Sequence, residues 1–349
     1  MARNYWSRKQ LFDTGAEYLI AFGQNASGKS YQGKLECIDR ALKGEKFFFL
    51  KRWKEDVKQA IVTHYFDDIP VKKITDNEWE GVLAWQGYFY FYRKDDKGEI
   101  EKSDIIGAYG ALNEWQRYKS NVYVNYTFML FEEFISKDVY LNDEPLTLFR
   151  LVTTIFRDHK GQVLMLGNTI SRTVPYFLEW IPQVVNQKQG TIEIYHMHDF
   201  SGEGDDVDIA VEYTGHFKGS GLMFFGEASK SIKGGEWSVD NRPKLPKDHI
   251  DYEKLYEVAI KYQNFQFVVE LLVDPEEGTK IIFVYPRTTD RKIDRLITTD
   301  FSDKMNVTRY FKDNRAEQSI LDCIANERMT FSDNLTASDF LSTIKMMEL

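Results

Sequence analysis

The amino-acid sequence predicts an α/β protein in which a central, mostly parallel sheet is followed by a smaller α+β part. An apolar run at residues 18–22 leads into a glycine-rich loop and then into residues 31–42, which have helical spacing. The apolar runs at 47–53 and 126–131 have the continuous hydrophobicity of strands buried on both faces of a parallel sheet. Near the carboxyl end, residues 265–285 contain two apolar runs around a turn, which predicts an antiparallel hairpin.

The chain length and one change of composition predict the domain boundaries. At 349 residues the chain is too long for one small domain and suits two. Residues 199–249 are first acidic and glycine-rich and then rich in Gly, Lys and Pro. We therefore expect one domain at 1–200, a linker or small subdomain at 201–250, and a second domain at 251–349.

The glycine-rich loop matches a phosphate-binding motif. Gly23-x-x-x-x-Gly28-Lys29-Ser30 fits the pattern G-x-x-x-x-G-K-[ST] at every fixed position. Glycines allow the backbone to aim successive N–H groups at phosphate oxygens, Lys29 can reach the β- and γ-phosphates, and the Ser30 hydroxyl can ligate Mg²⁺. We expect the nucleotide to contact the whole loop: Gly23, Gln24, Asn25, Ala26, Ser27, Gly28, Lys29, Ser30 and Tyr31. A glycine-rich turn without a ligand is the alternative.

Two carboxylates follow the apolar run at 126–131. Glu132 and Glu133 stand at the carboxyl end of this predicted strand, about a hundred residues after the phosphate loop. This placement is typical of a Walker B element, in which the first carboxylate orients the Mg²⁺ shell and the second polarises water. A pair of solvated loop acids is the alternative.

Two other predicted strands end in polar residues. The strand at 47–53 becomes abruptly basic at Lys51, Arg52 and Lys54, which could face phosphate, a neighbouring subunit or only solvent. The strand at 162–166 ends at Gly167-Asn168, where an amide could sense a γ-phosphate or simply form a turn.

The remaining elements follow from periodicity and turn signals. In the first domain we expect strands at 82–85, 88–92, 107–112 and 191–197, helices at 146–156 and 175–181, and a helical or looped stretch at 113–121. The strands at 82–85 and 88–92 and the turn at 93–98 form an antiparallel excursion before the sheet resumes. In the second domain we expect strands at 265–273, 280–285 and 296–299, and helices at 318–324 and 339–347.

Charge and apolar content exclude some classes of protein. The net charge of −9 gives no basic footprint, so any contact with nucleic acid must be local. No apolar run approaches the roughly 20 residues of a membrane span, and the first residues lack a signal-peptide apolar stretch. Cys37 and Cys323 lack metal-site spacing and are expected to be buried thiols of a cytosolic protein.

Several stretches together resemble one family, the DNA-packaging ATPases of small tailed phages of the phi-29 type. The resemblance is collinear, spans nearly the whole chain and is strongest over 20–180. It rests on Phe22–Tyr31, Leu50–Lys54, Trp115-Gln116, Lys119–Tyr123, Phe131–Ile135, Ile155–Arg157, Gly167-Asn168, Val174–Leu178 and Leu296–Phe301.

The resemblance implies a fold, a set of partners and a location. The fold would be an additional-strand (ASCE-type) P-loop ATPase domain with a ribonuclease-H-like carboxyl domain that has lost nuclease activity. The cofactors would be ATP and Mg²⁺. The protein would form a ring, of five subunits, docked on the portal of a prohead in the host cytoplasm, and would act on double-stranded DNA. A structural packaging RNA is a further candidate partner.

The resemblance also implies roles for individual residues. Glu132 corresponds to the Walker B carboxylate, Glu133 to the catalytic glutamate, Arg157 to an arginine finger acting on the neighbour's nucleotide, and Asn168 to the polar sensor. Lys119 and Lys137 fall in segments associated with the subunit interface or the DNA-facing pore. This chain departs from the family in having Glu132 in place of Asp, and in having only Ser136-Lys137 where more basic residues are expected.

The favoured function is an ATP-driven motor that translocates double-stranded viral DNA into a preformed capsid. One alternative is a terminase-like motor with an active nuclease in its carboxyl domain, whose available acids are Glu270, Asp274, Glu276, Glu277 and Asp300. The other alternative is a non-hydrolysing, nucleotide-gated module that binds RNA or capsid proteins.

Overall fold

The computed structural model describes most of the chain, which divides into two compact units. Described are residues 5–136, 140–157, 160–170, 172, 174–198, 206–215, 217, 242–262, 265–288, 293, 295–299, 307–308, 311 and 314–347. The first unit comprises Met1–Ile170 and Val174–Ser238, and the second comprises Ser171–Thr173 and Val239–Leu349. Each unit is described by itself.

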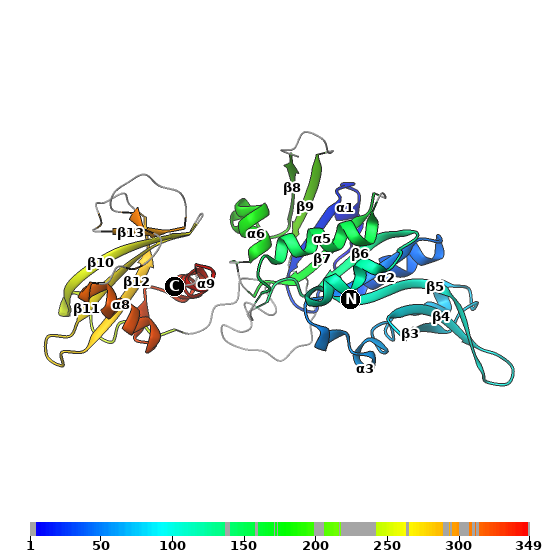
Figure 1. Ribbon diagram of the computed structural model, residues 1–349, viewed down its shortest axis with the longest axis horizontal. Coiled ribbons are helices and arrows are strands. Elements are labelled where there is room, and N and C mark those ends of the chain that lie inside the picture. The colour runs from blue at the N-terminus through cyan, green and yellow to red at the C-terminus, as the bar shows by residue number, and fades with distance from the viewer. Residues whose placement is uncertain are drawn as a thin grey trace. The chain divides into compact units, whose positions relative to one another are not determined.

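The first unit is built on a nine-stranded sheet with the order β3-β4-β5-β2-β6-β7-β1-β9-β8 (Figure 1). The six strands from β5 to β9 in this order are parallel, and antiparallel strands flank them at both edges. The strand bounds are β1 Tyr18–Gly23, β2 Lys46–Lys51, β3 Gly81–Trp85, β4 Tyr88–Lys94, β5 Ile100–Ala111, β6 Tyr126–Glu132, β7 Gln162–Asn168, β8 Thr191–Met197 and β9 Val207–Tyr213. β7 lies between β1 and β6 and is the additional strand that the family resemblance implies.

Helices cover both faces of this sheet. Successive side chains of its parallel strands point to opposite faces, and those on both faces are buried. On one face, Ile20 and Phe22 pack with residues of α5 (Glu144–Phe156) and α6 (Pro175–Trp180). On the other face, Leu19 and Ala21 pack with Cys37 and Ile38 of α2 (Lys29–Leu42). The other helices of this unit are α1 Lys9–Phe12, α3 Gln59–Val62, α4 Val71–Ile74, and the 3₁₀ segments η1 Lys54–Val57, η2 Leu112–Ser120 and η3 Pro182–Asn186.

The antiparallel excursion is confirmed and is longer than predicted. β5 begins at Ile100, where it pairs antiparallel with β4, and its last part pairs parallel with β2. A single strand therefore completes the hairpin and rejoins the parallel sheet. β2 ends at Lys51, two residues earlier than predicted, because Arg52 turns into the interior.

The expected linker at 201–250 is wrong in its first part. Residues 207–213 form β9, which pairs parallel with β1 from Tyr18 to Phe22. Ile209, Ala210 and Val211 are buried, so this segment belongs to the core of the first unit. The strand escaped prediction because acidic and glycine-rich residues surround it, and its pairing partner lies about 190 residues earlier in the chain.

The second unit has a six-stranded sheet with the order β14-β13-β10-β11-β12-β15. Strands β10, β11 and β12 form an antiparallel meander, and β13 adds parallel to β10, as in a ribonuclease-H-like sheet. The bounds are β10 Glu253–Tyr262, β11 Phe265–Val273, β12 Lys280–Pro286, β13 Arg295–Thr298, β14 Val307–Thr308, β15 Met329–Phe331, η4 His249–Asp251, α8 Arg315–Ala325 and α9 Asn334–Met346. The predicted hairpin of β11 and β12 is confirmed, whereas β10, β14 and β15 were not predicted. Among the described residues, no helix has the length and apolarity to cross a membrane.

Candidate nucleotide site

The glycine-rich loop connects β1 to α2, as the motif predicts. Gly23 and Gly28 have φ angles of +146° and +95°, which favour glycine over residues with a side chain. A Cβ atom on Gly23 would lie 2.1 Å from the Thr214 Oγ1 atom. The close approach of the segment after β9 therefore adds a packing reason for glycine at this position. Gln24 fixes the same segment through both amide atoms, which hydrogen-bond to the Phe217 backbone at 3.2 and 2.9 Å.

Lys29 is buried beneath this loop. Its Nζ atom donates to the Gln24 carbonyl oxygen at 2.6 Å, to Ser27 Oγ at 3.2 Å and to Asn168 Oδ1 at 3.3 Å. Asn168 lies directly opposite Gly23 in the parallel register of β7 and β1. Burial lowers the pKa of Lys29 to about 7, although the nearby Glu212 carboxylate acts in the opposite direction. The hydrogen-bond acceptors around Lys29 are neutral oxygens. A bound phosphate group would place a full negative charge against this buried ammonium.

The paired carboxylates stand at the end of β6, as predicted, and Lys51 bridges them. Lys51 Nζ lies 3.4 Å from Glu132 Oε2 and 3.1 Å from Glu133 Oε1. Glu132 is buried, whereas the Glu133 side chain is 72% exposed and its backbone has a φ of +58°. This strained conformation turns Glu133 out of the strand direction and toward solvent. The two acids therefore have different environments.

The carboxylate of Glu132 suits a hydrated Mg²⁺ ion. Its Oε1 atom is buried and has no hydrogen bond to any of the described residues. A buried, unpaired carboxylate oxygen is costly unless a cation or water satisfies it. The Glu132 charge also acts on Tyr65, whose pKa is raised well above its ordinary value by burial and then by this carboxylate. Ser30, in the first turn of α2, is exposed and can supply a hydroxyl ligand.

Arg52 holds the carboxylate loop in place from within the protein. Its Nε atom donates to both carboxylate oxygens of Glu144, at 3.0 and 2.9 Å. Its terminal nitrogens donate to the backbone carbonyl oxygens of Glu133 and Phe134, at 3.2 and 2.6 Å. Arg52 is 4% exposed and Glu144 is 0% exposed. The Arg52 guanidinium is thus held by contacts within its own chain, and the interpretation of this residue as a solvated strand exit is wrong.

Arg157 and Lys119 lie apart from these groups. Arg157 follows the last residue of α5, and its Nη2 atom donates to the Asn121 carbonyl oxygen at 2.6 Å. α5 leads from the carboxyl end of β6 back toward the amino end of β7, so Arg157 lies at the opposite edge of the sheet from the phosphate loop. Lys119 is in η2, two residues before Asn121, with its Nζ atom 4.2 Å from the centre of the Trp115 ring. Lys137 lies outside the described residues.

The structure thus collects four predicted groups at one edge of the sheet. Lys29 begins α2 after the loop that follows β1, and Asn168, Glu132 and Glu133 stand at the ends of the adjacent strands β7 and β6. From the sequence, Lys51 was only one of several basic residues at the end of a predicted strand. Its contact with both carboxylates follows from the pairing of β2 with β6, which the sequence does not show. The buried pair of Arg52 and Glu144 gave no sequence signal, because the two residues are 92 positions apart.

These features define the class of protein: an α/β P-loop protein of the additional-strand type. Within this class, the chain belongs to the podovirus DNA encapsidation protein (Gp16) family, whose model matches residues 4–346.

Known relatives match over nearly the full chain. The DNA packaging proteins of Bacillus phages PZA and phi29 are each 27% identical to this chain over 332 residues, and each match covers 90% of both chains. In the structure of the bacteriophage Phi-29 viral genome packaging motor assembly, a chain with 20% identity matches with a TM-score of 0.55 over 99% of both chains. At that level of identity, the structural match supports the fold.

Proposed function

We propose that this protein is the ATPase subunit of a ring-shaped motor that translocates double-stranded viral DNA into a preformed capsid. The observation that carries the proposal is the convergence of Lys29, Asn168 and the Glu132–Glu133 pair at the ends of neighbouring parallel strands. Family membership and the names of the relatives support the link to DNA packaging. The buried Lys29 and the carboxylate pair support hydrolysis over binding alone.

Each residue at this edge has a role in the proposed reaction. The loop amides from Gly23 to Tyr31 and the Lys29 ammonium bind the phosphates of ATP, and Asn168 senses the γ-phosphate from beside Lys29. Ser30 and Glu132 would hold Mg²⁺, which neutralises charge on the β- and γ-phosphates when bound. Glu133 accepts a hydrogen bond from the attacking water and orients it.

Arg157 completes the site of a neighbouring subunit. It is separated from the carboxyl end of β6 by the 13 residues of α5, a length of about 20 Å. Such a separation keeps Arg157 from its own phosphate loop and leaves it exposed for another copy of the chain. A ring, of five subunits in our proposal, places every Arg157 against the next nucleotide, with Lys119 on the same side.

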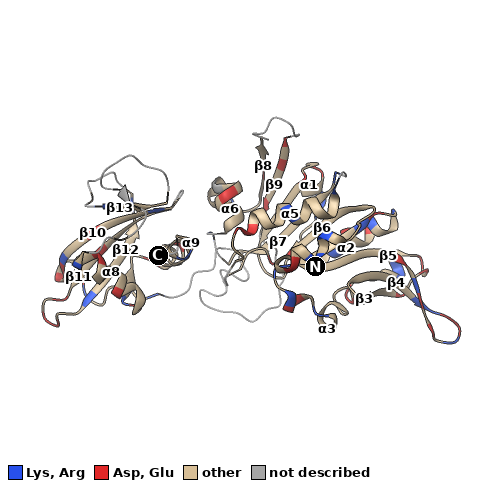
Figure 2. Cartoon of the chain, in the orientation of Figure 1, with Lys and Arg blue, Asp and Glu red and all other residues tan. Residues whose placement is uncertain are grey.

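The remaining partners follow from the motor function. The chain carries interspersed charges of both signs, including at the tip of the β4–β5 hairpin (Figure 2). DNA phosphates would therefore be held by local groups of basic side chains. Such a contact is independent of base sequence and weakens with salt. The portal of the prohead and a structural packaging RNA are proposed partners, and the site of action is a prohead in the host cytoplasm.

The contacts of the second unit disfavour an active nuclease. Glu270 accepts hydrogen bonds from His249 and Tyr285 at 2.7 and 2.9 Å. Although burial acts to raise the pKa of Glu270, these bonds lower it. Asp274 and Glu276 both pair with Lys247, at 2.9 and 2.8 Å. Within the part of the chain that the structure describes, no three acidic, His or Cys side chains are grouped as a metal site would require. Asp300 lies outside the described residues.

A packaging assay with purified proheads tests the proposal. We expect ATP turnover that rises when DNA and proheads are present, together with ATP-dependent protection of DNA from added nuclease. Background turnover under all conditions, with nucleotide still bound, would favour the non-hydrolysing module. Mn²⁺-dependent nicking of plasmid by the full chain would favour the terminase-like alternative.

A further inference from the structure

The segment at residues 5–8 contacts both the phosphate loop and the helix that follows it, α2. The Trp6 backbone N–H donates to the Ser27 carbonyl oxygen at 2.8 Å, and the Trp6 side chain is 1% exposed in the core beneath. A backbone hydrogen bond thus joins residue 6 to residue 27 of the loop, and burial of the Trp6 side chain anchors the segment in the core. The attachment fixes the position of the neighbouring Tyr5 relative to the loop.

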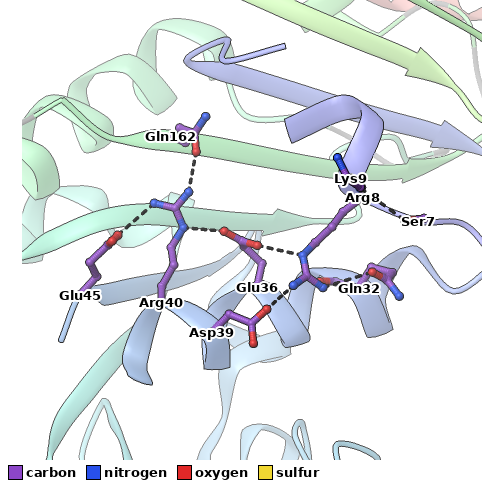
Figure 3. Close-up of polar contacts among 9 residues, drawn as sticks. All are labelled: Ser7, Arg8, Lys9, Gln32, Glu36, Asp39, Arg40, Glu45 and Gln162. Atoms are coloured by element: carbon purple, nitrogen blue, oxygen red, sulfur yellow. Dashed lines mark hydrogen bonds and ion pairs between the residues drawn. The ribbon is translucent and has the colours of Figure 1, made fainter. Parts of the chain in front are cut away.

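Arg8 clamps the same segment to α2 (Figure 3). Its Nε atom lies 2.8 Å from Glu36 Oε2, and its terminal nitrogens contact Asp39 and, at 3.1 Å, the Gln32 side chain. Glu36 is itself held by Arg40 at 2.8 Å. Arg8, Glu36 and Arg40 are all largely buried, so this network is more rigid than an exposed ion pair.

Tyr5 is the exposed aromatic residue of this segment. Its side chain is 53% exposed, yet it packs on the loop: a Cβ atom built on Gly28 would lie 3.2 Å from Tyr5 Cβ and 3.4 Å from Cδ1. Gly28 is the residue immediately before α2, where the φ of +95° and the absence of a side chain allow this approach. An aromatic ring therefore stands beside the first turn of the helix that follows the phosphate loop.

We propose that Tyr5 is the base-stacking residue of the nucleotide site, and that residues 5–8 form the wall on which the nucleoside rests. The inference rests on the proposed function. A phosphate loop cradles the α- and β-phosphates beside the start of its helix, so the nucleoside extends from there toward whatever borders Gly28. Stacking on an aromatic ring tolerates any base, because every base has a π-face. The chemical class bound is therefore a nucleoside triphosphate, with weak base selectivity.

Two probes separate contacts to the base from contacts to the phosphates. ATP carries both groups, whereas inorganic tripolyphosphate carries only the phosphates. We expect Tyr5→Ala in the full chain to weaken ATP binding by roughly 5- to 150-fold, the range of one base–aromatic stack. Tripolyphosphate binding should stay unchanged, and Tyr5→Phe should bind ATP like the wild type. Calorimetry measures all of these dissociation constants.

A second variant tests the clamp and a third serves as the control. Arg8→Gln should reproduce the selective loss of ATP affinity, because it frees the segment that carries Tyr5. Trp85→Ala, which removes a similarly exposed aromatic residue from β3, should change neither affinity. Equal weakening of ATP and tripolyphosphate in Tyr5→Ala, or no weakening of either, would overturn the proposal. If the wild type bound neither probe, the proposed function itself would fail, which is a distinguishable result.

Discussion

At the residue scale, Lys29 combines deep burial with hydrogen bonds to neutral oxygens. The carbonyl, hydroxyl and amide groups around it orient the ammonium but bring no full negative charge into contact with it. Its pKa of about 7 follows from this environment. Bound phosphates would restore a high pKa, so nucleotide binding and protonation of Lys29 are linked.

This linkage predicts proton uptake when nucleotide binds. At pH 8 the nucleotide-free Lys29 is mostly neutral, and binding of ADP with Mg²⁺ should take up close to one proton. At pH 6 the side chain is already charged, and the uptake should vanish. Calorimetry in two buffers with different ionisation enthalpies measures the proton number. Equal uptake at both pH values would show that Lys29 does not titrate in this range.

Glu133 is expected to act on water and not on binding. In Glu133→Gln the side chain keeps its shape and loses only its charge, so ATP should bind with wild-type affinity while turnover falls about 10²- to 10⁴-fold. Single-turnover kinetics and equilibrium binding measure the two effects. Glu101→Gln is the matched control, because Glu101 is an exposed carboxylate that also pairs with a cation, Arg93, and it should keep full turnover. Loss of ATP binding in Glu133→Gln would make Glu133 a structural residue.

At the element scale, the pair of Arg52 and Glu144 joins three segments of the first unit. Arg52 follows β2, the carbonyl groups that it binds follow β6, and Glu144 begins α5. Glu144 also accepts hydrogen bonds from the Tyr176 hydroxyl and the Leu141 N–H, both at 2.9 Å. The backbone of Glu133 and the helix that ends before Arg157 are therefore fixed by one buried network.

Breaking this network should destabilise the first unit. Arg52→Ala leaves the Glu144 charge buried without its partner, which costs about 3–5 kcal/mol in unfolding free energy. The exposed pair of Arg93 and Glu101 is the control, and Arg93→Ala should change the free energy of unfolding far less, because solvent screens this pair.

Tryptophan fluorescence during denaturant unfolding suits this measurement. All seven tryptophans lie between residues 6 and 237, so their signal reports on the first unit. A loss in Arg52→Ala no larger than that in Arg93→Ala would show that the buried pair does not stabilise the fold.

At the scale of the whole molecule, the proposed role of Arg157 requires assembly, because this residue lies far from its own phosphate loop. An isolated chain holds the phosphate-binding groups at one edge of its sheet and Arg157 at the other. In the proposed ring, the two edges of neighbouring subunits would meet at every interface, because each subunit presents the same two surfaces.

A mixing experiment tests whether Arg157 acts on the neighbouring subunit. Arg157→Ala should bind ATP normally and lose about 10³- to 10⁵-fold in turnover on assembled proheads. Mixed with Lys29→Ala subunits it should regain part of this turnover, because those neighbours still offer an intact Arg157 to a competent loop. No recovery at any mixing ratio would exclude action between subunits, and wild-type turnover in the single variant would remove the finger assignment.

The sequence alone determined the phosphate loop, the paired carboxylates and the main strands of the first unit. These features depend on local order: a motif of fixed spacing after an apolar run, or acids that directly follow a buried strand. The same reasoning placed Asn168 at a strand end, and the register of β7 then put its amide next to Lys29. The roles of these residues in hydrolysis stay predictions.

Only the tertiary structure decided which distant residues share the site. β9 joins the sheet beside β1, Lys51 meets both carboxylates, Arg52 turns inward to Glu144, and Tyr5 rests on Gly28. Each contact joins residues from separate segments of the chain, so no local pattern of hydrophobicity or charge encodes it. Burial energy of the whole sheet fixes the strand order, and the strand order then brings these side chains together.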